Sequence, residues 1–92
     1  MRDKIRTLHP EKKQGVNISK EKYEIIRDAI LSIMYAQKEI TFMKLTHGVE
    51  KTLNGKIEGS VTWHVTTVNL DLEARGTIKY IPHSRPQLIQ LV

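Results

Sequence analysis

The stretch SVTWHVTTVNLDLEARGTIKYI, residues 60–81, decides the fold. Within it, four apolar residues recur at helical spacing and mark one face of a helix: Val61, Val65, Val68 and Leu72. We expect Ser60 to cap this helix, because its hydroxyl can accept a hydrogen bond from a free backbone N–H of the first turn. Gly76 can end the helix in the left-handed conformation, and residues 77–81 are apolar and rich in β-branched side chains. The stretch therefore predicts a helix that leads at once into a strand.

The residues that follow predict a hairpin. Pro82 and Pro86 bracket a turn, and residues 87–92 form a second β-like segment. We expect the two strands to pair antiparallel at the C-terminus.

Two more helices are expected before residue 60. The first begins after Ser19, a candidate N-cap, and ends near Gln37. Its apolar residues recur at helical spacing: Tyr23, Ile26, Ile30, Ile33 and Met34. The second follows a short β-like step at residues 39–41, begins after Thr41 and ends at Asn54. Its apolar face comprises Phe42, Leu45, Val49 and Leu53.

Size and composition limit what the chain can be. Its 92 residues suit one domain, and 39% hydrophobic with 27% charged residues is typical of a globular protein rather than a disordered one. The absence of cysteine excludes a disulfide scaffold, a thiolate zinc finger and a cysteine nucleophile. The apolar runs are too short to span a bilayer, and no signal-peptide core follows the N-terminus. We therefore expect a cytoplasmic protein.

Positive charge is concentrated near the N-terminus. Residues 1–22 contain seven basic and three acidic residues, so they carry +4 of the formal net charge of +5. Residues 1–18 show no sustained hydrophobic period, and we interpret them as a basic flexible arm. Lysines such as Lys12 and Lys13 gain free energy by displacing counterions from phosphates, which favours a nucleic-acid-binding arm. The alternative is a solvated leader that aids solubility.

The order of the expected elements resembles that of a winged helix-turn-helix domain. Residues 72–78, LEARGTI, carry the resemblance: a leucine anchors the third helix, charged residues follow, a glycine ends the helix and a β-branched residue enters the wing. Residues 63–76, with the later PHSRP at residues 82–86, also resemble a small uncharacterised family of bacterial winged-helix proteins. The resemblance covers residues 19–92. It implies an α+β fold, mainly α, with three helices and a C-terminal two-stranded wing hairpin, and it allows a short third strand.

This resemblance implies a small DNA-binding protein of the kind that can regulate transcription. Residues 60–75 would be the recognition helix, which lies in the DNA major groove in proteins of this fold. The candidate phosphate-binding residues are basic and belong to the wing, the second helix and the arm: Arg85, Lys44, Lys51, Lys12 and Lys13. The weaker candidates for contacts with base edges are polar residues of the third helix: Thr62, Thr66 and Asn69.

The third helix also carries a second apolar stripe, on the side opposite the first. Its members are spaced i, i+4, i+7 and i+11: Trp63, Thr67, Leu70 and Ala74. No lysine or arginine lies between residues 60 and 74, although these side chains make the commonest specific contact, to guanine. Three interpretations stay open: the stripe packs under the arm or the wing, forms a dimer or partner interface, or faces DNA directly. The second gives an alternative function, a winged-helix protein-interaction or dimerisation module with little or no DNA binding.

Nothing in the sequence indicates catalysis. The four histidines include no i+3 or i+4 pair, and no cysteine can complete a zinc site. Asp71 and Glu73 are expected on different sides of the helix, which argues against an acid–base pair. We therefore expect a protein that is not an enzyme, with no metal, no cofactor, no small-molecule substrate and no membrane partner. DNA and a second copy of the chain are the expected partners.

Overall fold

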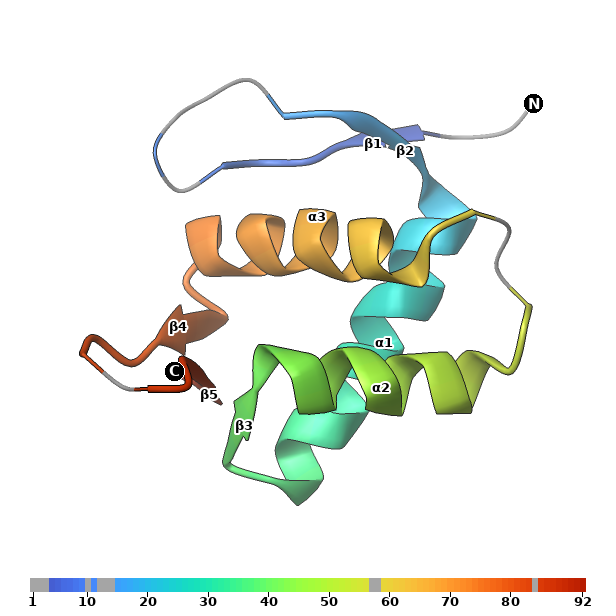
Figure 1. Cartoon of the computed structure of the whole chain (residues 1–92). Helices are drawn as coiled ribbons and strands as arrows, with labels where there is room; N and C mark the ends of the chain where they lie inside the picture. The colour runs from blue at the N-terminus through green and yellow to red at the C-terminus, as the bar shows by residue number, and fades with distance from the viewer. Residues whose placement is uncertain (1–3, 10, 12–14, 57–58, 84) are drawn as a thin grey trace.

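The computed structural model describes residues 4–9, 11, 15–56, 59–83 and 85–92. In this part of the chain, three helices and five short strands make an α+β fold. The helices are α1 (Lys20–Ala36), α2 (Phe42–Leu53) and α3 (Val61–Ala74). The strands are β1 (Lys4–Arg6), β2 (Asn17–Ser19), β3 (Glu39–Thr41), β4 (Ile78–Tyr80) and β5 (Leu88–Leu91). Figure 1 shows α2 and α3 one above the other, with α1 running across both.

Each helix begins where the sequence predicts an N-cap. The hydroxyls of Ser19, Thr41 and Ser60 each accept a hydrogen bond from the backbone N–H three residues further on. These bonds satisfy donors that a helix leaves free in its first turn. Asn54 ends α2 in the left-handed conformation, with φ of 47°. The three helices expected from the sequence are confirmed.

The buried side chains form one core between the helices and the C-terminal strands. Of the apolar face predicted for α3, Val65, Val68 and Leu72 are buried, and Val61 is half-buried and packs against the core. The buried apolar residues of the other two helices are Tyr23, Ile26, Ala29, Ile30 and Met34 in α1 and Leu45, Val49 and Leu53 in α2. Ile33 and Phe42, also expected in the core, are half-buried and pack against it.

The C-terminal strands form the expected antiparallel hairpin, and a third strand joins it. β5 pairs with β4 on one side and with β3 on the other, so the sheet order is β3–β5–β4. The buried Ile89 lies opposite Ile40 of β3 and Tyr80 of β4. The β-like step at residues 39–41 is therefore an edge strand that connects the start of α2 to the hairpin.

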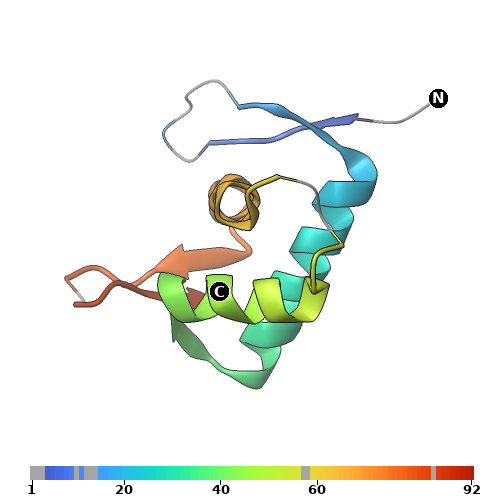
Figure 2. The ribbon, with the colours of Figure 1, turned by 45° about the vertical axis from the view of Figure 1, so that its right-hand side comes forward.

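The N-terminal segment differs from the expected arm. β1 and β2 pair antiparallel, with Ile5 opposite Ile18, and the Thr7 N–H donates to the Val16 carbonyl over 2.9 Å. Gly15 is required here, because a Cβ would lie 1.7 Å from the carbonyl oxygen of Thr7. Figure 2, which looks along α3, shows this hairpin lying over the helix. Where the structure describes the first 18 residues, they thus form a hairpin instead of an unpaired arm.

Asp71 of α3 joins the N-terminal hairpin and α1 to α3. Its side chain is fully buried. Its carboxylate accepts hydrogen bonds from the Leu8 backbone N–H and from Arg75 Nε, both at 2.8 Å, and from the Tyr23 hydroxyl. Burying a carboxylate is costly unless it is paired and hydrogen-bonded, and these donors meet both conditions. One side chain therefore connects three parts of the fold.

The substitution Asp71→Asn should lower the free energy of unfolding by about 3 kcal/mol, because it removes the charge on which the three donors converge. Denaturant-induced unfolding measures this loss. Asp28→Asn is the matched control: Asp28 is exposed and bonds Arg27 at the surface, so its loss should stay below about 1 kcal/mol. Equal losses from the two variants would show that Asp71 contributes no more than a surface carboxylate.

Tyr23 should make the stability of the protein depend on pH in the alkaline range. Burial, and then the hydrogen bond with Asp71, raises the pKa of Tyr23 from 10.0 to about 12. A raised pKa means that folding favours the neutral phenol, so its contribution is complete below about pH 10 and is lost as the pH rises toward 12. We expect the stability difference between wild type and Tyr23→Phe to be largest below about pH 10 and to shrink above it. Unfolding curves across this range that keep a constant difference would contradict the assignment.

Candidate nucleic-acid interface

The outward side of α3 lies between two hairpins. Figure 2 shows the β1–β2 hairpin above α3 and the β4–β5 hairpin below it. Thr62, Trp63 and Thr66 are exposed, whereas Leu70 and Ala74 are half-buried. The accessible surface of α3 is therefore mainly its N-terminal half.

The N-terminal hairpin packs over the middle of the second apolar stripe. Thr67 and Leu70 line a cavity of about 70 Å³ together with five residues of the hairpin: Thr7, Leu8, His9, Gly15 and Val16. Trp63, in the first turn, is 47% exposed and stands edge-on to the His64 ring, with the ring centroids 5.0 Å apart. The interpretation that the stripe packs under the N-terminal segment therefore holds for Thr67 and Leu70. It does not hold for Trp63, which keeps a large solvent-exposed surface.

Two of the three candidates for base contacts are accessible. Thr62 and Thr66 are exposed. Asn69 is fully buried, so in this structure it does not reach a base edge, and the prediction for this residue is corrected. The reason is its position four residues after the core residue Val65, which turns its side chain inward rather than to solvent. Its amide makes no hydrogen bond of good geometry in the part of the chain that the structure describes.

The phosphate-contact candidates that the structure describes are exposed on two elements. Lys44 and Lys51 lie in the first and last turns of α2, and Arg85 lies in the loop between β4 and β5. Lys12 and Lys13 lie outside the described residues. The structure thus distributes three exposed cations over α2 and the loop and does not gather them in one cluster.

The C-terminal end of α3 adds no free positive charge. Arg75 Nε donates to Asp71, and this hydrogen bond is the main cause that raises the pKa of Arg75. On the neighbouring strand β4, burial raises the pKa of Tyr80, and the negative charge of Glu73 raises it further. The C-terminal end of α3 therefore carries Arg75, whose charge is paired with Asp71, and the acidic residue Glu73.

The sequence analysis missed a pocket between α2 and α3. Its volume is about 400 Å³, and its described lining comes from both helices: Phe42, Met43, Thr46, His47, Glu50 and Thr62. Local sequence patterns do not indicate this pocket, because Phe42, which lines it, belongs to the apolar face that is expected to pack in the core. The pocket exists only because the fold brings Thr62 to α2, a contact that no local pattern reveals.

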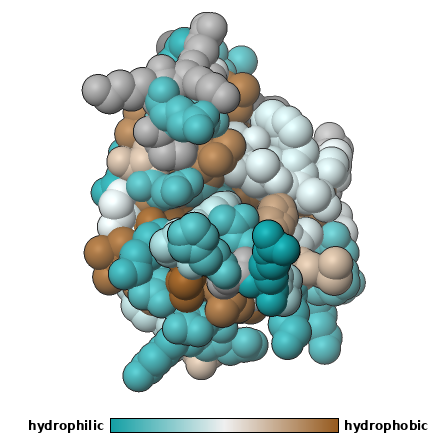
Figure 3. Space-filling view, turned by 60° about the vertical axis from the view of Figure 1, so that its left-hand side comes forward, coloured by the Kyte–Doolittle hydropathy of each residue, from teal (hydrophilic) through white to brown (hydrophobic). Residues whose placement is uncertain are grey.

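The surface near the C-terminal hairpin is mixed in character. Figure 3 shows polar side chains over much of one face of the molecule, with smaller apolar patches between them. Among the described residues, no three potential metal ligands gather into a group that could hold an ion. No helix within the same ranges is long and apolar enough to cross a membrane.

A family model matches the chain over residues 4–89, a range that includes the N-terminal hairpin, all three helices and the C-terminal sheet up to the middle of β5. No curated protein and no solved structure matches it. The matched model describes a family of unknown function. Because the match covers nearly the whole chain, the protein belongs to that family, DUF6958.

Proposed function

We propose that the chain is a winged helix-turn-helix domain that binds duplex DNA mainly through phosphate groups. The order of elements supports this: after the N-terminal hairpin come helix, strand, helix, helix, strand and strand, and the last sheet has the order β3–β5–β4. The observation that carries the proposal is the β4–β5 hairpin, which follows α3 directly and exposes Arg85 in its loop. A wing in this position brings a cation to the DNA backbone while the helix approaches a groove.

The N-terminal hairpin limits how α3 can approach DNA. Because the hairpin packs over Thr67 and Leu70, that side of the helix is unavailable to a groove. Thr62 lines the pocket against α2, and Thr66 follows it by four residues on the same side of the helix; both are exposed. Residues in the N-terminal part of a recognition helix commonly contact base edges, so these two hydroxyls are the ones that face the bases.

Binding of this kind is largely independent of sequence. The accessible part of α3 offers hydroxyl groups and Trp63, but no lysine or arginine. Charge comes instead from Lys44, Lys51 and Arg85, which gain free energy from phosphates whatever the base sequence. Hydroxyls discriminate poorly between bases compared with a bidentate arginine or asparagine.

Titration of labelled random-sequence duplex DNA, followed by fluorescence anisotropy at several salt concentrations, tests the proposal. We expect affinity to fall steeply as salt rises, and Arg85→Ala to reduce the slope of log K against log salt by about 1, the loss of one phosphate contact. Lys38→Ala is the matched control, because it removes the same charge from an exposed residue between α1 and β3. Figure 1 shows this connection at the end of the fold away from α3. No binding at low salt, or equal effects of the two substitutions, would contradict the proposal.

A second candidate function, self-association, rests on Trp63. A tryptophan that is 47% exposed beside a half-covered apolar stripe is an unusual surface feature. Tryptophan is enriched among the residues that dominate protein interfaces. In a symmetric dimer, the same patch around Trp63 would meet its copy on the partner. Thr67, Leu70 and Ala74 contribute less to this surface, because all three are half-buried.

Sedimentation velocity at increasing protein concentration tests self-association. We expect a dimer that Trp63→Ala weakens by about 2 kcal/mol or more, because truncating a central aromatic side chain removes a dominant contact. Tyr35→Ala is a suitable control, since Tyr35 is 75% exposed on α1 and should leave the dimer unchanged. A wild-type protein that stays monomeric at the highest concentration would exclude this function.

A further inference from the structure

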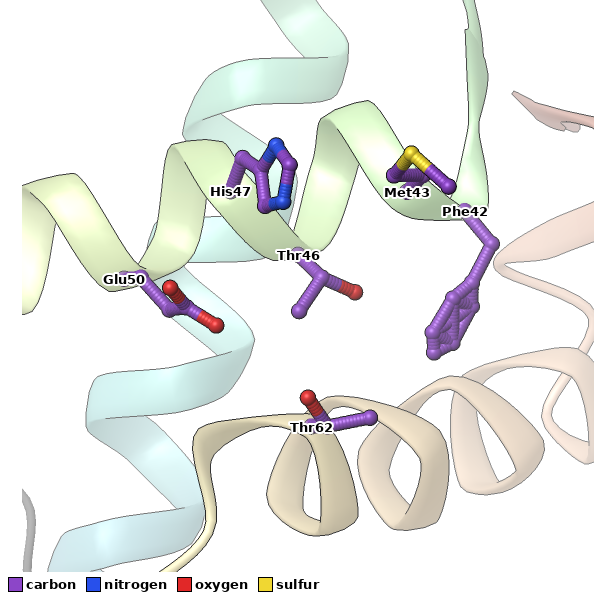
Figure 4. A pocket seen from close by; sticks show the side chains of 6 residues that line it. All are labelled: Phe42, Met43, Thr46, His47, Glu50 and Thr62. Carbon is purple, nitrogen blue, oxygen red and sulfur yellow. The ribbon is translucent and has the colours of Figure 1, made fainter.

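Three side chains make up the exposed surface of α3. Among residues 61–74, all of which the structure describes, the exposed ones are Thr62, Trp63 and Thr66. Thr66 follows Thr62 by four residues and Trp63 by three, so the three side chains are neighbours on one side of the helix. Thr62 lies at the border with α2, and Figure 4 shows its side chain pointing from α3 toward that helix. The exposed side of the proposed recognition helix thus combines two threonines with an indole.

The polar side chains of α3 that are suited to paired hydrogen bonds with a base are covered or bonded elsewhere. His64 is 7% exposed, and its Nδ1 donates to the Ser60 carbonyl over 2.7 Å. Asn69 is fully buried, and Arg75 Nε, past the far end of the helix, donates to the buried Asp71. The exposed N-terminal half of α3 therefore offers no bidentate contact of the kind that arginine makes with guanine or asparagine with adenine.

The same half of α3 does offer apolar surface. Thr62 and Thr66 each carry a methyl group, and Trp63 is 47% exposed. The His64 ring stands edge-on to the indole, with the ring planes at 84°, so the indole has a neighbour that limits its movement. In the major groove of DNA, thymine presents an apolar group at its edge, the C5 methyl. Apolar contact with that methyl group is the base recognition that this surface fits.

We propose that α3 contacts the C5 methyl group of thymine through the Trp63 indole and the Thr66 methyl group. This inference rests on the proposed DNA binding and adds a preference for thymine-containing duplexes to it. Phosphate contacts hold the protein on any duplex, because they depend on charge alone. Burial of the thymine methyl against an apolar side chain adds a modest preference that does not depend on charge.

Uracil-containing DNA tests the inference, because uracil lacks the C5 methyl group and keeps the charge and the hydrogen-bonding groups of thymine. We expect the protein to bind a labelled A·T duplex more tightly than the same duplex with deoxyuridine in place of thymidine. Burial of one methyl group should contribute about fourfold, which corresponds to about 0.8 kcal/mol.

DNA methylated at C5 of cytosine is the second probe, because it presents the same methyl group on a G·C pair. We expect a methylated G·C duplex to bind more tightly than its unmethylated form by a similar factor. This comparison separates contact with the methyl group from the shape and stiffness of A·T-rich DNA.

Two substitutions assign the contact. Trp63→Ala should bring the ratio of the thymine and uracil affinities close to one. Thr66→Ser removes one methyl group, keeps the hydroxyl and should lower the ratio. Tyr35→Ala is the matched control, because Tyr35 is 75% exposed on α1 and should leave the ratio unchanged. Trp63 is the one tryptophan of the chain, so a change in its fluorescence on binding reports directly that the indole meets DNA.

The outcomes distinguish this inference from the proposed function. Equal affinity for the thymine and uracil duplexes, or a thymine preference without the matching preference for methylated cytosine, would overturn the inference and leave DNA binding intact. A ratio that Trp63→Ala does not change, or indole fluorescence that saturating DNA leaves unchanged, would also overturn it. No binding of any duplex at low salt would contradict the proposed function itself, and this inference with it.

Discussion

One buried carboxylate decides which side of α3 the protein can use. Asp71 is bonded to the hairpin through Leu8, to α1 through Tyr23 and to the end of its own helix through Arg75. The hairpin cannot leave α3 without removing a donor from a charge that has no access to water, which is strongly unfavourable. The covered and the open sides of α3 both follow from this arrangement, and so does the direction from which any partner approaches the helix.

The open side contains two surfaces that share one residue. Thr62 belongs to the exposed N-terminal half of α3 and also lines the pocket against α2. The proposal of DNA binding rests on the exposed Arg85 in the loop between β4 and β5.

The sequence predicted the parts of the fold whose signals are local. Helix caps such as Ser60 and apolar spacing within one helix need no knowledge of the rest of the chain. The N-terminal hairpin has no comparable local pattern, because each of its strands is only three residues long. The close approach of its two strands also requires Gly15 beside the Thr7 carbonyl, and this contact joins residues that are eight positions apart. No local sequence pattern indicates that Asp71 is buried. Its hydrogen-bond donors Leu8 and Tyr23 precede it by 63 and 48 residues, so they meet it only in the folded chain.

Accessibility at the candidate site could be predicted only in part. Lys44, Lys51, Arg85, Thr62 and Thr66 are exposed, as the predicted contacts require, and their role in binding stays a prediction. The burial of Asn69, the covered stripe and the pocket depend on contacts between distant segments.

Hydrogen exchange at the Leu8 amide tests most directly whether Asp71 holds the hairpin on α3. The Leu8 residue is 45% exposed, yet its N–H donates to a carboxylate that is fully buried. This account predicts that the Leu8 amide exchanges slowly in the wild type, because exchange requires the hairpin to leave the helix. In Asp71→Asn the same amide should exchange much faster, while amides in the middle of α1 remain slow. A Leu8 amide that exchanges in the wild type as fast as an unstructured peptide would contradict the account.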